Sequence, residues 1–98
     1  MKGFGNQIKS KKKLNNFRTR QYHQQLMNEA VKHQSAGNIS EAKKYYRQLI
    51  KEGLEDANVF NNYGIILVNL GEFKEAELSI RKAIELNPKD PAAHTNLG

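Results

Sequence analysis

Three asparagines recur at one fixed interval in this chain of 98 residues. Asn28, Asn62 and Asn96 are each separated by 34 positions. A side-chain amide can donate a hydrogen bond to a peptide carbonyl and accept one from a peptide N–H. A row of asparagines could therefore hold the backbone of a bound peptide without reading its side chains. The same amides could instead bond between neighbouring helices of the fold.

Residues suited to catalysis or metal binding do not form a recognisable pattern. His23, His33 and His94 lack ligand spacing such as HExxH, and cysteine is absent, which removes disulfides, thiolate ligands and thiol catalysis. The sequence contains no nucleophile–base pair, phosphate-cradling glycine loop or paired carboxylates on a shared face. We therefore expect this segment to have no enzyme activity, no cofactor and no metal.

Positive charge is concentrated at the N-terminus. The net charge is +6, but residues 1–20 hold seven cations and no anion, which leaves nine cations and ten anions in residues 21–98. This basic segment could bind nucleic acid or another anion, with Phe17 and Tyr22 able to stack on bases. It could also be a disordered tail or an upstream extension of the first helix. The candidate anion-binding residues are Lys9, Lys11, Lys12, Lys13, Arg18 and Arg20.

Neither a secretory signal nor a membrane span is visible in the sequence. The N-terminal cations are not followed by the apolar stretch of a signal peptide. No run approaches the roughly 18 apolar residues that suggest a spanning helix. Together with the absence of cysteine, these features lead us to expect a cytoplasmic protein with no membrane partner.

The segments that must position the asparagines repeat with the same 34-residue period. The matched pairs include Gly37 with Gly71 and Ala42 with Ala76. A self-similar period of this length is typical of stacked helical repeats. The resulting frames are residues 23–56, residues 57–90 and an opening fragment, residues 91–98.

Each full frame is predicted to contain two helices. In the second frame, the first helix has its apolar positions three and four residues apart and ends at Gly71, and the second begins near Phe73 and ends before Pro88. Gly37 is the corresponding stop in the first frame. The predicted N-terminal caps are Asn38, paired with Glu41, for the second helix of the first frame and Asp90 for the third frame. Gly64 is predicted to lie opposite Ala76, with Tyr63 and Ile80 at its flanks.

These positions resemble the tetratricopeptide repeat, a 34-residue helix–turn–helix unit. Residues 57–90 match it at Phe60, Tyr63, Gly64, Ala76, Ala83 and Pro88. Residues 23–56 match more loosely, with Leu54 where proline is usual. The resemblance implies an all-α fold of tetratricopeptide repeats that forms the start of a right-handed α-solenoid. Residues 23–56 would be the first repeat, residues 57–90 the second and residues 91–98 the start of a truncated third.

The resemblance also implies a protein–protein interaction module at the N-terminal end of a larger protein. Its concave face, lined by the first helix of each repeat, would bind an extended peptide or a partner helix. The segment could alternatively be a substrate-recruiting arm of a transferase whose catalytic domain follows residue 98. The row of asparagines is similar to the asparagine ladder of O-GlcNAc transferase-like repeats. The implied peptide-binding residues are Gln24, Asn28, Gln34, Asn58, Asn61, Asn62, Ile65, Asn69 and Asn96.

One familiar ligand of such repeats is not expected here. Chaperone-binding members hold a C-terminal carboxylate with Lys and Arg from successive first helices. In the corresponding helices of this chain the only such cation is Lys32, which is not at a matching clamp position.

Overall fold

The structure is a computed structural model that describes the backbone of residues 2–89, 91 and 95, and the side chains of residues 17–89, 91 and 95. Its helices are α1 (Lys2–Ser35), α2 (Ile39–Lys51), α3 (Ala57–Asn69) and α4 (Phe73–Leu86). The described residues contain no strand. The expected all-α class is therefore confirmed.

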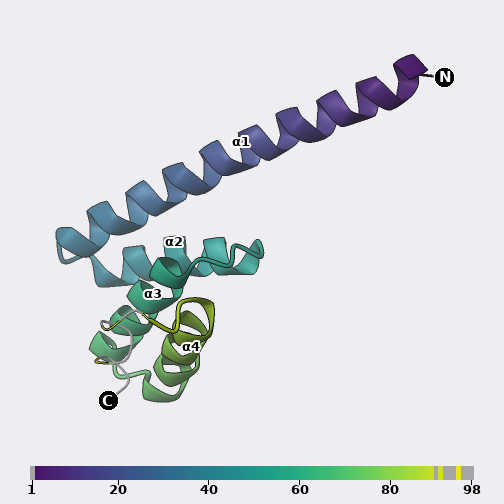
Figure 1. Ribbon diagram of the computed structural model, residues 1–98. Helices are drawn as coiled ribbons and strands as arrows, with labels where there is room; N and C mark the ends of the chain where they lie inside the picture. The colour runs from purple at the N-terminus through teal and green to yellow at the C-terminus, as the bar shows by residue number, and fades with distance from the viewer. Residues whose placement is uncertain (1, 90, 92–94, 96–98) are drawn as a thin grey trace.

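The helices pack in chain order. α1 packs against α2, α2 against α3, and α3 against α4 (Figure 1). Short turns join them, so each helix returns alongside the one before it. The result is two helical hairpins, α1–α2 and α3–α4, joined through the contact between α2 and α3. α1 is much the longest helix and projects well beyond the other three (Figure 1).

Glycines end the first three helices in one common geometry. Gly37, Gly53 and Gly71 have φ of 83°, 86° and 79°, the left-handed region in which a side chain is strained. After α1 the N–H of Asn38 bonds to the carbonyl of His33 at 2.8 Å, and after α3 the N–H of Glu72 bonds to the carbonyl of Leu67 at 2.8 Å. These are Schellman motifs, which satisfy carbonyls that the helix end leaves open. The predicted stops at Gly37 and Gly71 are confirmed.

The caps differ from one helix start to another. Asp56 caps α3, because its carboxylate accepts the N–H groups of Asn58 at 2.8 Å and Val59 at 3.2 Å. The predicted capping pair of Asn38 and Glu41 is wrong.

The reason is the backbone at Asn38, which has φ −82° and ψ 69° and makes no side-chain bond to the helix. Asn38 lies in the Schellman turn that ends α1, so its amide nitrogen faces His33 Nδ1 at 3.4 Å instead. Glu41 pairs with Lys44. The predicted cap at Asp90 lies outside the described residues.

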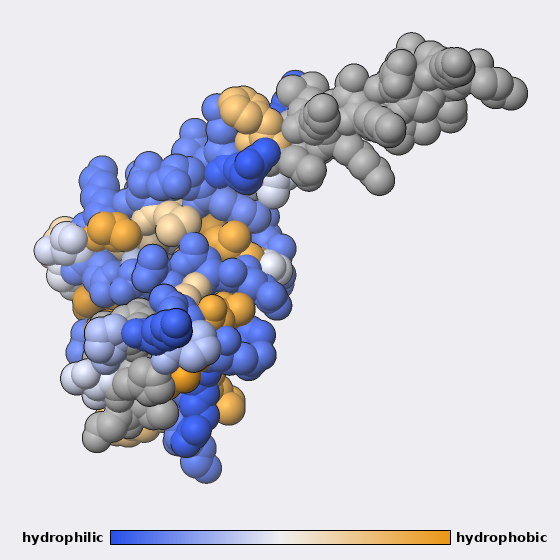
Figure 2. Space-filling view, viewed as in Figure 1, coloured by the Kyte–Doolittle hydropathy of each residue, from blue (hydrophilic) through white to orange (hydrophobic). Residues whose placement is uncertain are grey.

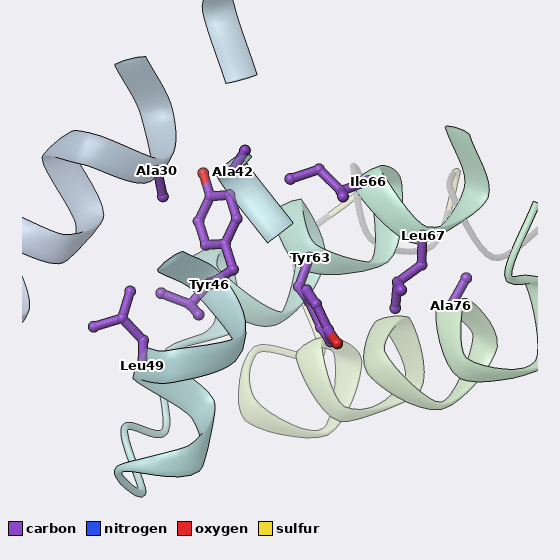
Figure 3. Close-up of a cluster of buried hydrophobic side chains, with 9 residues drawn as sticks. Ala30, Ala42, Tyr46, Leu49, Tyr63, Ile66, Leu67 and Ala76 are labelled. Atoms are coloured by element: carbon purple, nitrogen blue, oxygen red, sulfur yellow. The ribbon is translucent and has the colours of Figure 1, made fainter. Parts of the chain in front are cut away.

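The core runs through both hairpins. Figure 3 shows its buried side chains, which come from all four helices: Ala30, Ala42, Tyr46, Leu49, Val59, Tyr63, Ile66, Leu67 and Ala76. Because one cluster spans both hairpins, burial of apolar surface stabilises the two hairpins as a single unit.

Gly64 lies at the tightest approach between α3 and α4. A Cβ atom built at this position would overlap Ile80 Cγ1, lie 3.1 Å from Ile80 Cδ1 and lie 3.4 Å from the carbonyl oxygen of Ala76. Glycine is therefore required by packing, since its own backbone is helical. Gly64 does face the backbone of Ala76, as predicted, and Ile80, predicted at its flank, supplies the side chain that closes on it.

Candidate functional site

A continuous polar and aliphatic surface runs along α3. Asn58, Asn62, Ile65 and Asn69 recur at intervals of four, three and four residues, so they share one side of the helix. Asn58 and Asn69 are exposed, while Asn62 and Ile65 are half-buried. Val68, 42% exposed, borders them. The helix takes this orientation because its remaining aliphatic positions face the core.

The set of predicted peptide-binding residues on α3 also contains Asn61. Asn61 lies next to the face of α3 that packs against the core, and it is only 8% exposed. Asn61 therefore offers little surface to a ligand, whereas Asn58 and Asn69 offer much more. We define the α3 surface as Asn58, Asn62, Ile65, Val68 and Asn69.

α1 contributes a second group of side chains. Gln24 donates from Nε2 to Asn28 Oδ1 at 3.0 Å, one turn along the exposed side of the helix. Val31, 48% exposed, follows on the same side. Gln34 is half-buried. We define the α1 surface as Gln24, Asn28, Val31 and Gln34.

The two surfaces are connected through a buried tyrosine of α2. The hydroxyl of Tyr46 donates to Gln34 Oε1 at 2.8 Å, and the side-chain amide of Asn62 lies close enough to the Tyr46 hydroxyl to influence its pKa. Tyr46 is 1% exposed. Burial raises the pKa of Tyr46, and the interaction with Asn62 opposes that rise in part. The Tyr46 hydroxyl is thus bonded to one amide of the α1 surface and lies beside one amide of the α3 surface.

The predicted row of asparagines is not uniform, because its members have different surroundings in the structure. Asn28 is exposed and bonded within α1, Asn62 is half-buried and lies beside Tyr46, and Asn96 lies outside the described residues. The two described asparagines are therefore not equivalent, although they occupy the same position in their frames. Nothing in the sequence pattern distinguishes them, because the difference comes from the neighbouring helix.

A shallow recess lies at the end of the α3 surface. Its volume is about 130 Å³, and it is lined by Ile65, Val68, Asn69 and Ile80. The first three residues belong to α3, and Ile80 reaches it from α4. Three aliphatic side chains and one amide make it suited to an aliphatic side chain of a ligand, with the amide at its rim.

A second, more polar recess of about 350 Å³ lies between α2 and the turn before α4. Its lining residues are Ser40, Lys43, Lys44, Arg47, Leu70 and Glu72. Lys43 Nζ donates to both carboxylate oxygens of Glu72 at 2.9 Å, and Lys44 pairs with Glu41. Each of these lysines is therefore paired with a carboxylate, and the Lys43–Glu72 ion pair connects the two hairpins. The sequence did not reveal this ion pair, because the partners are 29 residues apart.

His23 and His33 each lie against a residue of another part of the fold. The His33 and Tyr45 rings stack with centroids 5.5 Å apart and planes 10° apart. His23 Nε2 lies 3.4 Å from Glu52 Oε1. Among the described residues, no three histidines or carboxylates come together in an arrangement that could hold a metal ion.

The basic residues proposed from the sequence all fall within α1. Arg18 and Arg20 are exposed. The backbone of Lys9, Lys11, Lys12 and Lys13 belongs to the same helix, and their side chains lie outside the described residues. Within the described part of the chain, no helix has the length and apolar character needed to cross a membrane.

Comparison with protein families gives one match. Residues 57–90, which comprise α3, α4 and the turn after α4, match the family model described as tetratricopeptide repeat. This is the span of the second 34-residue frame. No curated protein sequence is significantly similar to the chain.

Proposed function

We propose, from the tetratricopeptide match at residues 57–90, that this chain is a protein-interaction module that binds an extended peptide across the α1 and α3 surfaces. Tetratricopeptide repeats are non-catalytic and generally mediate contacts between proteins. The observation that carries the proposal is the α3 surface itself. It places exposed amides beside an aliphatic recess on a helix that has no charged residue.

The chemistry of these residues indicates the kind of ligand. Asn58 and Asn69 can each donate to and accept from a peptide backbone, which requires an extended ligand whose own backbone groups are unpaired. Ile65 and Val68 favour an aliphatic ligand side chain in the adjacent recess. Because α3 is uncharged, charge on the ligand would contribute little to binding there. An extended segment with spaced aliphatic residues fits these conditions best.

Asn28 and Asn62 are proposed to contact the ligand in different ways. Asn28 is exposed and lies beside Gln24, so both groups of its amide are close to solvent. The amide of Asn62 lies beside the Tyr46 hydroxyl. Its Oδ1 would be the atom that accepts a ligand N–H, while Tyr46 helps to orient the amide. The proposal thus keeps the ligand-binding role expected for the row of asparagines but gives Asn28 and Asn62 different contacts.

Hydrophobic side chains on the face seen in Figure 2 form separate small patches between hydrophilic ones. Such a surface suits recognition by several modest contacts, as in peptide binding, better than a broad apolar dimer interface. We therefore favour a peptide ligand over a large globular partner.

A peptide array tests the proposal. The 98-residue chain is applied to immobilised extended peptides that vary in the number and spacing of aliphatic residues. Val68→Asp places a charge beside the recess and is expected to lower binding by about tenfold or more, since an unpaired charge is costly to bury. The matched control is Leu78→Asp, because Leu78 is a 70% exposed aliphatic residue on α4, outside the proposed surface.

The result that supports the proposal is loss of binding by Val68→Asp with retention by Leu78→Asp. Equal binding by the two variants would exclude the α3 surface as the contact. Asn69→Ala is a milder second variant, which removes the amide at the rim and retains the helix. Circular dichroism establishes that all three variants retain their helix content.

A further inference from the structure

The N-terminal part of α1 extends beyond the folded body. His23 lies against Glu52, the C-cap residue of α2, with 3.4 Å between Nε2 and Oε1. α2 therefore ends beside His23, and the α1 backbone before it continues past its partner helix (Figure 1). We call residues 2–22 the basic arm. At 1.5 Å per residue, a helix of this length is about 30 Å long.

Charge separates the basic arm from the rest of the chain. Its sequence contains seven cations and no anion, whereas residues 23–98 contain nine cations and ten anions. The mean spacing is about one positive charge per 4 Å of helix axis. Nucleic acids carry negative charge at comparable or higher density, and release of their counterions makes binding to such a helix favourable. A peptide with a few acidic residues would neutralise only part of this charge.

Two aromatic residues in the arm are exposed among its arginines. Phe17 is 54% and Tyr22 is 44% exposed, and Arg18 and Arg20 between them are exposed as well. Neither aromatic residue belongs to the core cluster. Exposed aromatic rings next to cations are the combination with which proteins stack on unpaired bases while holding the phosphates.

This combination favours single strands over a membrane surface. Only five of residues 2–22 are apolar or aromatic. A helix that lies in a membrane interface needs a continuous apolar face to insert. Unpaired bases, by contrast, offer a flat surface to each exposed ring, and duplex DNA would leave the rings without a partner.

We propose that the basic arm binds single-stranded nucleic acid, with its lysines and arginines contacting phosphates and with Phe17 and Tyr22 stacking on bases. This activity is independent of peptide binding by the α1 and α3 surfaces, because it uses the part of α1 that lies beyond the α2 contact. The chain would then connect a nucleic acid to a protein partner.

Fluorescence anisotropy of a labelled oligothymidylate, titrated with the full 98-residue chain over a salt series, tests the proposal. If about five cations contact phosphates, the logarithm of the association constant should fall with the logarithm of salt concentration with a slope of about −3.5. The triple variant Lys11→Gln, Lys12→Gln and Lys13→Gln should reduce the magnitude of that slope by about 2 and lower the affinity at least tenfold at moderate salt.

The matched control removes the same charge from the folded body. Lys44→Gln, Lys74→Gln and Lys89→Gln replace three exposed lysines outside the arm, and affinity should change by less than about twofold. The double variant Phe17→Leu and Tyr22→Leu tests stacking separately. It should lower the affinity by about fivefold or more, since stacking contributes about 1–3 kcal/mol per base, and leave the salt slope unchanged.

Equal losses of affinity in the triple lysine variant of the arm and in the triple lysine variant of the folded body would overturn the proposal, because net charge alone would then explain binding. Binding to phosphatidylserine vesicles without binding to the oligonucleotide would assign the arm to a membrane and overturn it as well. An unchanged affinity in the aromatic variant would exclude stacking, and the proposal requires both contacts. Helix content measured by circular dichroism confirms that each variant is folded.

Discussion

The hydroxyl of Tyr46 donates a hydrogen bond to Gln34 Oε1 at 2.8 Å, across the interface between α2 and α1. The same hydroxyl lies beside the side-chain amide of Asn62 on α3. One buried polar atom of α2 thus interacts with both α1 and α3. This relationship couples the stability of the fold to the orientation of two side chains on the proposed binding surface.

Tyr46→Phe should lower the free energy of unfolding by about 1–1.5 kcal/mol, the usual cost of losing a buried hydrogen bond whose partners remain. Urea denaturation followed by circular dichroism measures the change. Tyr45→Phe is the matched control, because Tyr45 is half-buried and interacts with His33 through its ring. The control should change stability by less than about 0.5 kcal/mol. A loss of the same size in both variants would show that the Tyr46 hydroxyl has no special role.

Gly64→Ala should destabilise the chain by up to about 2 kcal/mol, because overpacking against Ile80 costs about 1–3 kcal/mol and the gain in helix propensity offsets about 1 kcal/mol of it. Ile80→Ala removes both atoms that the new methyl group would meet, at the cost of a cavity. In a double-mutant cycle, Gly64→Ala should therefore be stabilising or neutral when Ile80 is already alanine. Strictly additive effects would contradict the close contact between these residues.

Asp56→Ala should lower stability by about 1 kcal/mol, since the carboxylate caps α3 through two backbone N–H groups. Asn38→Ala occupies the equivalent place before α2 but makes no such bond. Its effect should be below about 0.5 kcal/mol. Thermal melts of both variants measure the difference. A larger loss of stability from Asn38→Ala than from Asp56→Ala would contradict the assignment of Asp56 as the residue that caps its helix.

Stability should decline in alkaline solution as Tyr63 ionises. Burial, then the hydrogen bond to Glu75 Oε1 at 2.8 Å and the charge of that carboxylate, raise the pKa of Tyr63 to about 12 from an ordinary value of 10.0. The folded state therefore holds its proton more tightly than the unfolded state. This contribution is fully present below pH 10 and is lost as pH rises from about 10 to about 12, with a limiting slope of about 1.4 kcal/mol per pH unit.

Urea denaturation across this pH range measures the slope. Tyr63→Phe should make it shallower, and Glu75→Gln should give an intermediate slope because burial remains while the carboxylate charge is removed. If Tyr63→Phe retains the slope of the original chain, another group is responsible for the alkaline loss.

The sequence by itself determined the helical class, the turns and most of the core. The 34-residue period, the glycines and the apolar spacing are local signals, and local backbone preference is enough to end α1 at Gly37 and α3 at Gly71. Ala42 and Ala76, which the 34-residue period pairs, are both buried. The sequence also predicted that the residues of the α3 surface lie together, because helical periodicity decides which side chains are on the same side of a helix.

Only the tertiary structure decided which of these residues remain available to a ligand and which make contacts within the fold. Tyr46 engages Asn62 but not Asn28, Lys43 pairs with Glu72 across 29 residues, and Ile80 closes on Gly64. Each contact joins residues that are far apart in the sequence, and its geometry depends on how the helices pack. Periodicity fixes the direction of a side chain from its own helix axis, but the distance to a partner on another helix is set by packing of the whole core. For that reason two asparagines at the same repeat position have different surroundings.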